Sequence, residues 1–242
     1  MIWARVDGMP VIVLLRHGVS SANTAGILAG RAPGVSLTDQ GISALRETLR
    51  MLPNQHFSRL LHSPLLRCEQ TAEIARETIS ADTVAAVDDL IELDYGEWTG
   101  RSLKDLGGEE LWKTVIDNAS QARFPGGESI AEAAERAVAR VATVVEELRN
   151  EERDDEKQRD PNSDEKKTST SRWAMLVSHG DIIKALIADA LAMPLDDFQR
   201  ISVAPGSFTV IDYSGPRPVL SAMSITAAGL AEGNTPGGGG LR

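Results

Sequence analysis

The sequence of 242 residues predicts a three-layer α/β/α fold with a mostly parallel central sheet. Continuous apolar runs such as residues 11–15 alternate with segments whose apolar residues recur every three or four positions, which indicates strands alternating with helices. Uninterrupted apolar strands are typical of a sheet that is covered on both faces. Polar pairs, Arg16-His17 and Ser178-His179, directly follow two of these strands. Parallel strands end at one edge of a sheet, where ligands bind, so we expect these pairs to meet there.

The amino-terminal half is expected to contain three strands and two helices. The expected strands are residues 11–15, 57–62 and 83–87. Thr38 can cap the first helix, whose apolar residues recur at helical spacing from Ile42 to Leu52. In the second helix, Ser63 is expected to be the cap and Pro64 to occupy the first turn, where a missing N–H costs nothing.

The carboxyl-terminal half begins with residues 90–128, which we interpret as irregular because they are rich in glycine and acidic residues. Trp98, Trp112 and Phe124 in this segment are expected to pack rather than to contact a substrate. Ser129 is expected to begin a long helix, followed by a strand at 173–177 and another helix. The expected closing strands are residues 201–203, 208–213 and 219–225.

The domain organisation predicted from the sequence is a single domain over residues 1–231. Residues 150–171 are almost all charged or small polar residues without apolar periodicity, which predicts a disordered surface insertion. Residues 232–242 include four consecutive glycines and are expected to form a disordered tail.

The composition excludes several classes of function. A formal net charge of −10 and a pI near 4.9 argue against a general nucleic-acid binder. Cys68 is the only cysteine, so no disulfide can form within the chain, and we expect a small buried side chain there rather than a redox centre. No apolar run is long enough to cross a membrane, and residues 1–10 do not resemble a signal peptide. A cytoplasmic protein is therefore expected; the oligomeric state stays open, with a homodimer as one candidate.

Two arginines and two histidines are predicted to form a phosphate-sized basic pocket. Arg16 and His17 follow one strand, His179 follows another, and Arg67 lies in the first turn of a helix. A helix N-terminus favours anions, and the fork of an arginine fits two phosphoryl oxygens at once. One imidazole can act as a nucleophile toward phosphorus, and a carboxylic acid from residues 92–97 can protonate the leaving oxygen.

Four segments carry a resemblance to a known family. They read, in order, VIVLLRHGVSSAN, LLHSPLLRCEQTAE, LIELDYGEWTG and MLVSHGDIIKAL. They resemble the four signatures of the histidine phosphatase superfamily, branch 1, which is phosphoglycerate mutase-like, and the match runs from about residue 11 to residue 213. Four motifs in the right order form a specific signal, whereas an Arg-His-Gly triplet alone is weak.

The resemblance implies a fold, an activity and a set of site residues. It implies a metal-independent phosphomonoester hydrolase without a cofactor, in which His17 forms a phosphohistidine intermediate and Glu92 is the proton donor. Glu97 is the rival donor, but the Gly96-Glu97-Trp98 segment is more typical of a packed turn. The phosphate-binding residues that it implies are Arg16, Asn23, Gly30, Arg67, His179 and Gly180. The implied partner is a small phosphomonoester.

The sequence departs from the family pattern at two positions. Val19 stands where family members often carry a glutamate, and Asp181 places an anion beside the phosphate pocket. We expect Asp181 to cap its helix and point away. His62 ends a strand near the pocket, where a structural role and a contribution to substrate binding both remain open.

Three alternative functions fit the sequence less well than hydrolysis does. A metal site on His17 and His179 is disfavoured because no third ligand stands at metal spacing and two arginines would repel a cation. A phosphoglycerate mutase would need further basic residues around its substrate, yet Arg31 is the only basic residue in residues 24–36. A non-catalytic phosphate-binding module is disfavoured because the histidines, the arginines and Glu92 are all present.

Overall fold

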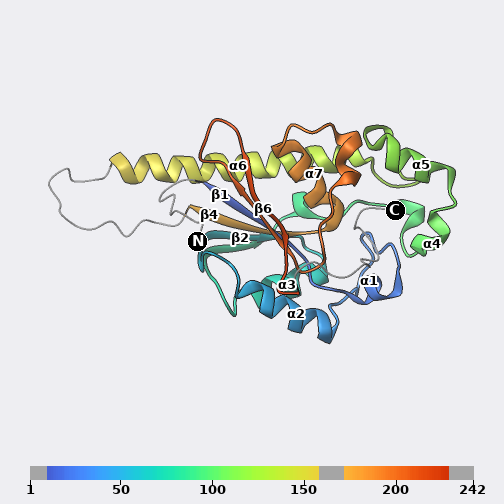
Figure 1. Ribbon diagram of the computed structural model, residues 1–242, viewed down its shortest axis with the longest axis horizontal. Coiled ribbons are helices and arrows are strands. Elements are labelled where there is room, and N and C mark those ends of the chain that lie inside the picture. Colours follow the sequence, from blue (N-terminus) through green and yellow to red (C-terminus); the bar gives the residue numbers. More distant parts are fainter. Residues whose placement is uncertain (1–9, 158–171, 229–242) are drawn as a thin grey trace.

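The computed structural model describes residues 10–157 and 172–228, which form one α/β unit around a six-stranded sheet (Figure 1). The strands are β1 (Val11–Arg16), β2 (His56–His62), β3 (Ser80–Ala86), β4 (Trp173–Ser178), β5 (Phe208–Asp212) and β6 (Val219–Ile225). The α-helices are α1 (Ser21–Ala25), α2 (Asp39–Leu49), α3 (Leu66–Ala75), α4 (Leu103–Leu106), α5 (Glu110–Asp117), α6 (Ile130–Lys157) and α7 (Gly180–Ala190). Short 3₁₀ helices are η1 (Asp88–Leu90), η2 (Gly96–Trp98), η3 (Ala119–Gln121) and η4 (Leu195–Arg200).

The sheet has the strand order β3-β2-β4-β1-β5-β6. β3, β2, β4 and β1 pair in parallel, while β5 pairs antiparallel with β1 and β6 antiparallel with β5. The predicted mostly parallel sheet is therefore confirmed. β1 and β4 lie side by side in its centre, so the residues that follow these two strands emerge together.

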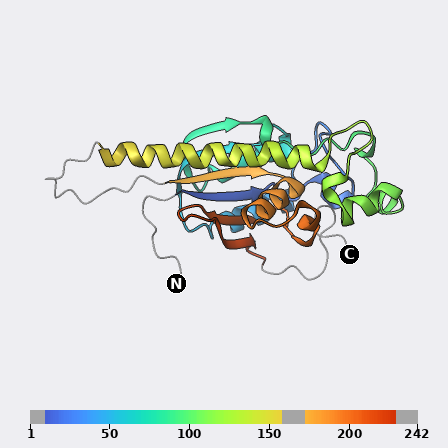
Figure 2. The ribbon, with the colours of Figure 1, turned by 90° about the horizontal axis from the view of Figure 1, so that it is seen from above.

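Helices cover both faces of the sheet, as the buried β1 run predicts. Ile12 and Leu14 belong to the core cluster that includes α6 and α7 residues, whereas Val13 and Leu15 belong to the cluster under α2 and α3. Figure 1 shows α2 and α3 on one side of the strands and α6 and α7 on the other, and in Figure 2 α6 runs lengthwise along the sheet. Successive side chains of a strand point to opposite faces, so one apolar run serves both cores.

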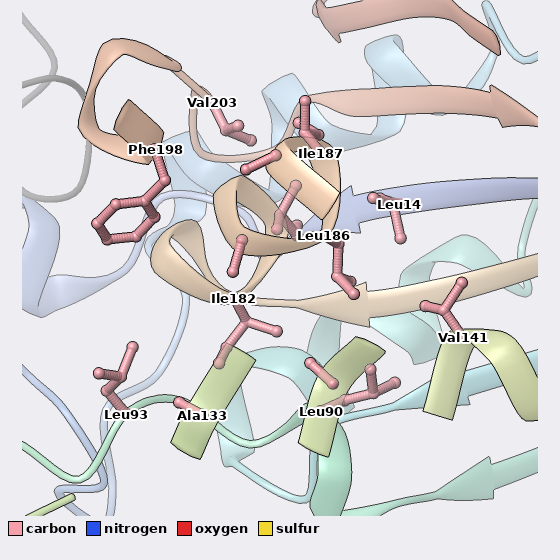
Figure 3. Packing of buried hydrophobic residues seen from close by; sticks show 14 of the residues in the cluster. Leu14, Leu90, Leu93, Ala133, Val141, Ile182, Leu186, Ile187, Phe198 and Val203 are labelled. Carbon is pink, nitrogen blue, oxygen red and sulfur yellow. The ribbon is translucent and has the colours of Figure 1, made fainter. Parts of the chain in front are cut away.

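The core between the sheet and α7 fixes the strand ends that form the cleft. Ile182, Leu186 and Ile187 of α7 are at most 2% exposed, and Figure 3 shows them among Leu14 of β1 and Phe198 of η4. Burial of each such side chain contributes about 1.5–3 kcal/mol relative to its exposure to water. The first turn of α7 is thereby held rigidly against β1 and β4.

The structure corrects three expected elements. Residues 90–128 are not irregular throughout, because α4, α5 and two short 3₁₀ helices (η2 and η3) lie within them. Residues 201–203 form no strand: the carbonyl oxygen of Val203 accepts a hydrogen bond from Arg16 Nη1 (2.5 Å) instead of pairing with a neighbouring strand. The long helix begins at Ile130 as expected, but it continues to Lys157, into the range predicted as an insertion.

Two predicted disordered segments fall largely outside the described residues. These are residues 158–171 of the insertion and all of the tail, 232–242. Within residues 10–157 and 172–228, the helices all lack the combination of length and apolar character that crossing a membrane requires.

Candidate active site

The side chains predicted to form the site converge at the carboxyl ends of β1, β2 and β4. Backbone hydrogen bonds join these ends: His17 N donates to Ser178 O (3.0 Å) and Ser63 N donates to Val177 O (2.9 Å). A cleft opens beside them, with an empty space of about 760 Å³ that includes open solvent at its mouth. Among the predicted residues, its lining includes Arg16, His17, Asn23, Gly30, Arg67, Glu92 and Gly180.

His17 presents one ring nitrogen to the cleft with its lone pair available. Its Nδ1 lies 2.8 Å from the carbonyl oxygen of Gly18, and a carbonyl can only accept, so Nδ1 carries the proton. Burial lowers the pKa of His17 well below its usual value, and the charges of Arg67 and Arg16 lower it further. The ring is therefore neutral at pH 7, and its Nε2 is unprotonated.

The two arginines are buried and held by backbone carbonyls. Arg67, in the first turn of α3, is 2% exposed and donates from Nη2 to the carbonyl oxygen of Gly30 (2.8 Å). Gly30 adopts a left-handed conformation (φ 49°), and a Cβ atom there would lie 2.9 Å from Tyr95, so the close approach of this loop requires glycine. Arg16 is 3% exposed, and burial lowers its pKa although Glu92 and Asp181 counteract that effect. Two buried cations side by side favour the binding of an anion.

The ring of His179 lies next to the ring of His17. The ring centroids are 5.3 Å apart, and the side chain of His179 is fully buried. Its Nε2 lies 2.8 Å from Ser63 Oγ. Burial lowers the pKa of His179 well below its usual value, as do Arg67 and His17, so this ring is also neutral at pH 7.

Ser63 contacts His179 rather than capping a helix, which corrects the prediction for this turn. α3 begins at Leu66, and its N-cap residue, Leu65, makes no side-chain cap. Leu65, the residue after Pro64, is extended, so the helix starts later than predicted. Cys68 is fully buried, and burial raises the pKa of its thiol to about 12, so it packs as the small side chain that was expected.

Of the two candidate proton donors, Glu92 lines the pocket and Glu97 does not. Glu92 is 8% exposed, and its Oε2 lies 4.0 Å from His179 Nδ1. Burial raises its pKa to about 7, and the negative charge of Asp181 adds to that rise. Glu97 lies in η2, is exposed and is not among the residues that line the cleft.

Asn23 and Gly180 border the pocket in different ways. Asn23 lines the cleft from α1. Its Oδ1 accepts hydrogen bonds from Ser20 N (3.0 Å) and Ser20 Oγ (2.9 Å), so the side-chain nitrogen is the group that could contact a ligand. Gly180 is the first residue of α7, and a Cβ atom there would lie 3.2 Å from Arg16 Cζ. The missing side chain therefore leaves room for the Arg16 guanidinium. Val19 and His62 are not among the cleft-lining residues.

Asp181 lines the cleft instead of pointing away, which corrects another prediction. Its Oδ2 accepts a hydrogen bond from Tyr95 Oη (2.8 Å) and its Oδ1 one from Lys184 Nζ (3.1 Å). Burial would raise its pKa, yet Lys184 and Tyr95 outweigh burial and the pKa is lowered. The carboxylate is tolerated near the phosphate site because Lys184, three residues later on the same helix face, offsets its charge.

The aromatic side chains of residues 90–128 both pack and line the cleft. Trp98 and Phe124 are 3% exposed members of the core, and the half-buried Trp112 lies against Trp98 with ring centroids 5.9 Å apart. All three also line the cleft, so the sequence prediction of packing alone was incomplete.

The sequence did not reveal the residues that hold the backbone of Glu92. Arg31 Nε donates to Glu92 O (2.9 Å), and Arg31 and Arg136 share the carboxylate of Glu128. Ser178 Oγ donates to Leu90 O (2.8 Å), which ties the same segment to the end of β4. These partners lie far apart in the chain, so no spacing pattern could have identified them. Among the described residues, no group of three or more His, Cys, Asp or Glu side chains is placed to hold a metal ion.

Comparison with known proteins identifies the family of this chain. The sequence pattern of the histidine phosphatase superfamily (branch 1) matches residues 12–156 and 159–226, which is most of the chain. The chain belongs to the histidine phosphatase superfamily.

Relatives within this superfamily carry two kinds of name. An adenosylcobalamin/alpha-ribazole phosphatase of Salmonella typhi is 28% identical over 82% of this chain and 88% of its own length. A protein of Proteus mirabilis named probable phosphoglycerate mutase GpmB is 27% identical over 90% of this chain and 92% of its own. The alpha-ribazole phosphatase of Shigella flexneri has a similar structure (TM-score 0.69, 24% identity, covering 89% of this chain and 96% of that one), which shows the shared fold.

Proposed function

We propose that this histidine phosphatase hydrolyses small phosphomonoesters through a phosphohistidine intermediate on His17. The observation that carries the proposal is the neutral ring of His17, whose Nδ1 is fixed on Gly18 so that Nε2 offers its lone pair beside two buried arginines. Such a nucleophile needs no base to activate it, because no proton has to leave before attack.

The first half-reaction transfers the phosphoryl group to the protein. His17 Nε2 attacks phosphorus, the bond from phosphorus to the alcohol oxygen breaks, and Glu92 gives its proton to that oxygen so that the alcohol leaves neutral. In the second half-reaction a water molecule attacks the phosphohistidine, Glu92 takes the proton of the water, and inorganic phosphate leaves as the P–N bond breaks. Glu92 is thus restored to its acid form.

The surrounding groups stabilise the charge of the transferring phosphoryl group. Arg16 and Arg67 are positioned to hold its equatorial oxygens, and His179 adds a donor beside His17. The Asn23 amide nitrogen and the backbone of Gly180 at the start of α7 supply further donors. The loop of Gly30 contributes by fixing Arg67.

Hydrolysis is favoured over mutase chemistry by the position of Arg31. This arginine is the only basic residue in residues 24–36, and it does not line the cleft. Its guanidinium is paired with Glu128 (2.8 Å), where it supports the backbone of Glu92. A phosphoglycerate mutase must retain a phosphorylated intermediate that bears a carboxylate. Arg31 is not available to bind that carboxylate, because it pairs with Glu128 and the Glu92 backbone.

The test is an assay of phosphate release from p-nitrophenyl phosphate in the presence of EDTA. The native protein is expected to be active, His17→Ala to be inactive, and His56→Ala to match the native protein because His56 lies at the opposite end of β2. Radioactive phosphate from a labelled ester should remain on the denatured native protein in an acid-labile, alkali-stable form and be absent from His17→Ala.

Two results would overturn the proposal. One is equal activity of the native protein and His17→Ala. The other is conversion of 3-phosphoglycerate to 2-phosphoglycerate at a rate far above its hydrolysis, which would assign mutase chemistry to the same site.

A further inference from the structure

The cleft extends beyond the phosphate-binding groups into a chamber with two distinct walls. The aromatic wall consists of Tyr95, Trp98, Trp112 and Phe124. The polar wall consists of Asp181, Lys184 and Gln199. Neither wall is needed to hold a phosphoryl group, because the arginines and histidines that serve this purpose lie outside both walls. The chamber is therefore where the alcohol portion of a substrate would lie.

The aromatic wall concentrates a residue type that is scarce in this chain. The chain has four tryptophans, two tyrosines and four phenylalanines, and four of these ten side chains line this one cleft. Phe124 joins them by edge contacts, with ring centroids 4.9 Å from Tyr95 and 5.3 Å from Trp98. Trp112 is only half-buried and lines the cleft. A rigid aromatic surface of this kind favours a flat apolar ring.

The polar wall is electrically balanced. Lys184 is 1% exposed; its ammonium donates to Asp181 Oδ1 (3.1 Å) and Gln199 Oε1 (2.7 Å) and lies 5.3 Å from the centroid of the Phe198 ring. Two of the three N–H bonds of the ammonium group are used in these hydrogen bonds, and the Asp181 carboxylate offsets its charge. Lys184 consequently offers no free positive charge to a ligand. Asp181 accepts one bond on each oxygen and retains lone pairs for a further donor.

The charges of the lining therefore distinguish the two ends of the cleft. Arg16 and Arg67 stand at the phosphate end, and Lys184, already paired, is the remaining cation among the described residues that line the cleft. A carboxylate on the alcohol would meet the Asp181 carboxylate, and Lys184 is already paired with Asp181. Bringing like charges together in a partly buried site costs free energy.

We propose that the chamber selects phosphomonoesters of uncharged alcohols that carry a flat apolar ring, and that the Asp181–Lys184 pair rejects alcohols that carry a carboxylate. This inference rests on the proposed phosphomonoesterase function. Trp112 supplies the stacking surface, and Asp181 accepts a hydrogen bond from a hydroxyl or N–H group of the alcohol.

The test compares kcat/KM for three esters of primary alcohols, so that leaving-group chemistry is similar among them. The esters are 2-phenylethyl phosphate, ethyl phosphate and 3-phosphoglycerate, with phosphate release as the readout. The native protein is expected to prefer 2-phenylethyl phosphate over ethyl phosphate at least tenfold, and to hydrolyse 3-phosphoglycerate more slowly than ethyl phosphate.

Two variants test the contributions of the aromatic wall and of the polar wall separately. Trp112→Ala should lower the preference for the phenylethyl ester at least threefold and leave ethyl phosphate nearly unchanged. Trp173→Ala is the matched control, because Trp173 is also half-buried but lies at the amino end of β4 against Phe57. Asp181→Asn removes the counter-charge of Lys184 and should raise the ratio of 3-phosphoglycerate to ethyl phosphate at least fivefold. Any effect of Asp181→Asn on Glu92 acts on both esters and cancels in that ratio.

The outcomes distinguish this inference from the function on which it rests. Equal kcat/KM for the phenylethyl and ethyl esters, a native preference for 3-phosphoglycerate, or ratios unmoved by both variants would overturn the selectivity. Absence of hydrolysis of all three esters and of p-nitrophenyl phosphate would instead overturn the phosphomonoesterase function itself.

Discussion

Replacing Glu92 with glutamine tests the proton donor most directly. With a pKa of about 7, Glu92 is about half protonated at pH 7, whereas a carboxyl group with the ordinary value of 4.5 would be only about 0.3% protonated. Burial therefore raises the population of the acid form by roughly two orders of magnitude. Glutamine preserves the size of the side chain, and it is neutral like the acid form of Glu92 but cannot give a proton to the leaving group.

The expected loss depends on how much the leaving group needs that proton. General acid catalysis contributes roughly 10²–10⁴-fold, so Glu92→Gln should lower kcat/KM for ethyl phosphate by about that factor. The loss should be below about tenfold for p-nitrophenyl phosphate, because nitrophenolate departs without protonation. The parameter kcat/KM is the appropriate one because it covers the steps through alcohol release and excludes hydrolysis of the phosphohistidine.

Glu97→Gln is the matched control, since Glu97 is exposed and outside the cleft, and it should behave as the native protein does. Burst kinetics with p-nitrophenyl phosphate should show rapid nitrophenol release by Glu92→Gln followed by slow turnover. If Glu92→Gln reduced kcat/KM by the same factor for both esters, Glu92 would be a substrate-positioning residue and the assignment of the proton donor would be wrong.

Further predictions concern pH, packing, charge and metal. Because the acid form of Glu92 is the active one, kcat/KM for ethyl phosphate should fall as pH rises above about 7, and a pH–rate profile without that basic limb would contradict this. Gly180→Ala places a methyl group 3.2 Å from Arg16 Cζ and should lower kcat/KM about tenfold with little change in melting temperature; an unchanged kcat/KM would show that Arg16 tolerates displacement. Lys184→Met leaves the Asp181 carboxylate buried without its cation and should cost about 3–5 kcal/mol in urea unfolding, much of it restored when Asp181→Asn is added. Activity should survive dialysis against EDTA, and its recovery only on addition of a divalent cation would refute metal independence.

Much of the fold was predictable because its signals are local. The continuous apolar run of β1, the Thr38 cap of α2 and the helical spacing after Ser129 are written in neighbouring residues, and each corresponds to an observed element. Expected boundaries were wrong where tertiary contacts override local signals. Residues 201–203 form no strand, and the Val203 carbonyl accepts a hydrogen bond from Arg16 instead. Ser63 was expected to cap a helix, but α3 begins at Leu66 and the Ser63 hydroxyl contacts His179.

The sequence by itself determined which chemical groups reach the edge of the sheet. Arg16, His17, Arg67 and His179 follow strands or open a helix, and parallel strands that end together must bring them to one place. The family resemblance then indicated Glu92.

Only the tertiary structure decided the protonation states and the surroundings of these groups. A pKa depends on burial and on charges from distant segments, so neither the neutral ring of His17 nor the raised pKa of Glu92 could be derived from spacing. The same holds for the pairing of Asp181 with Tyr95 and for the aromatic wall of the cleft. These features depend on distances between residues far apart in the chain, and folding alone sets those distances.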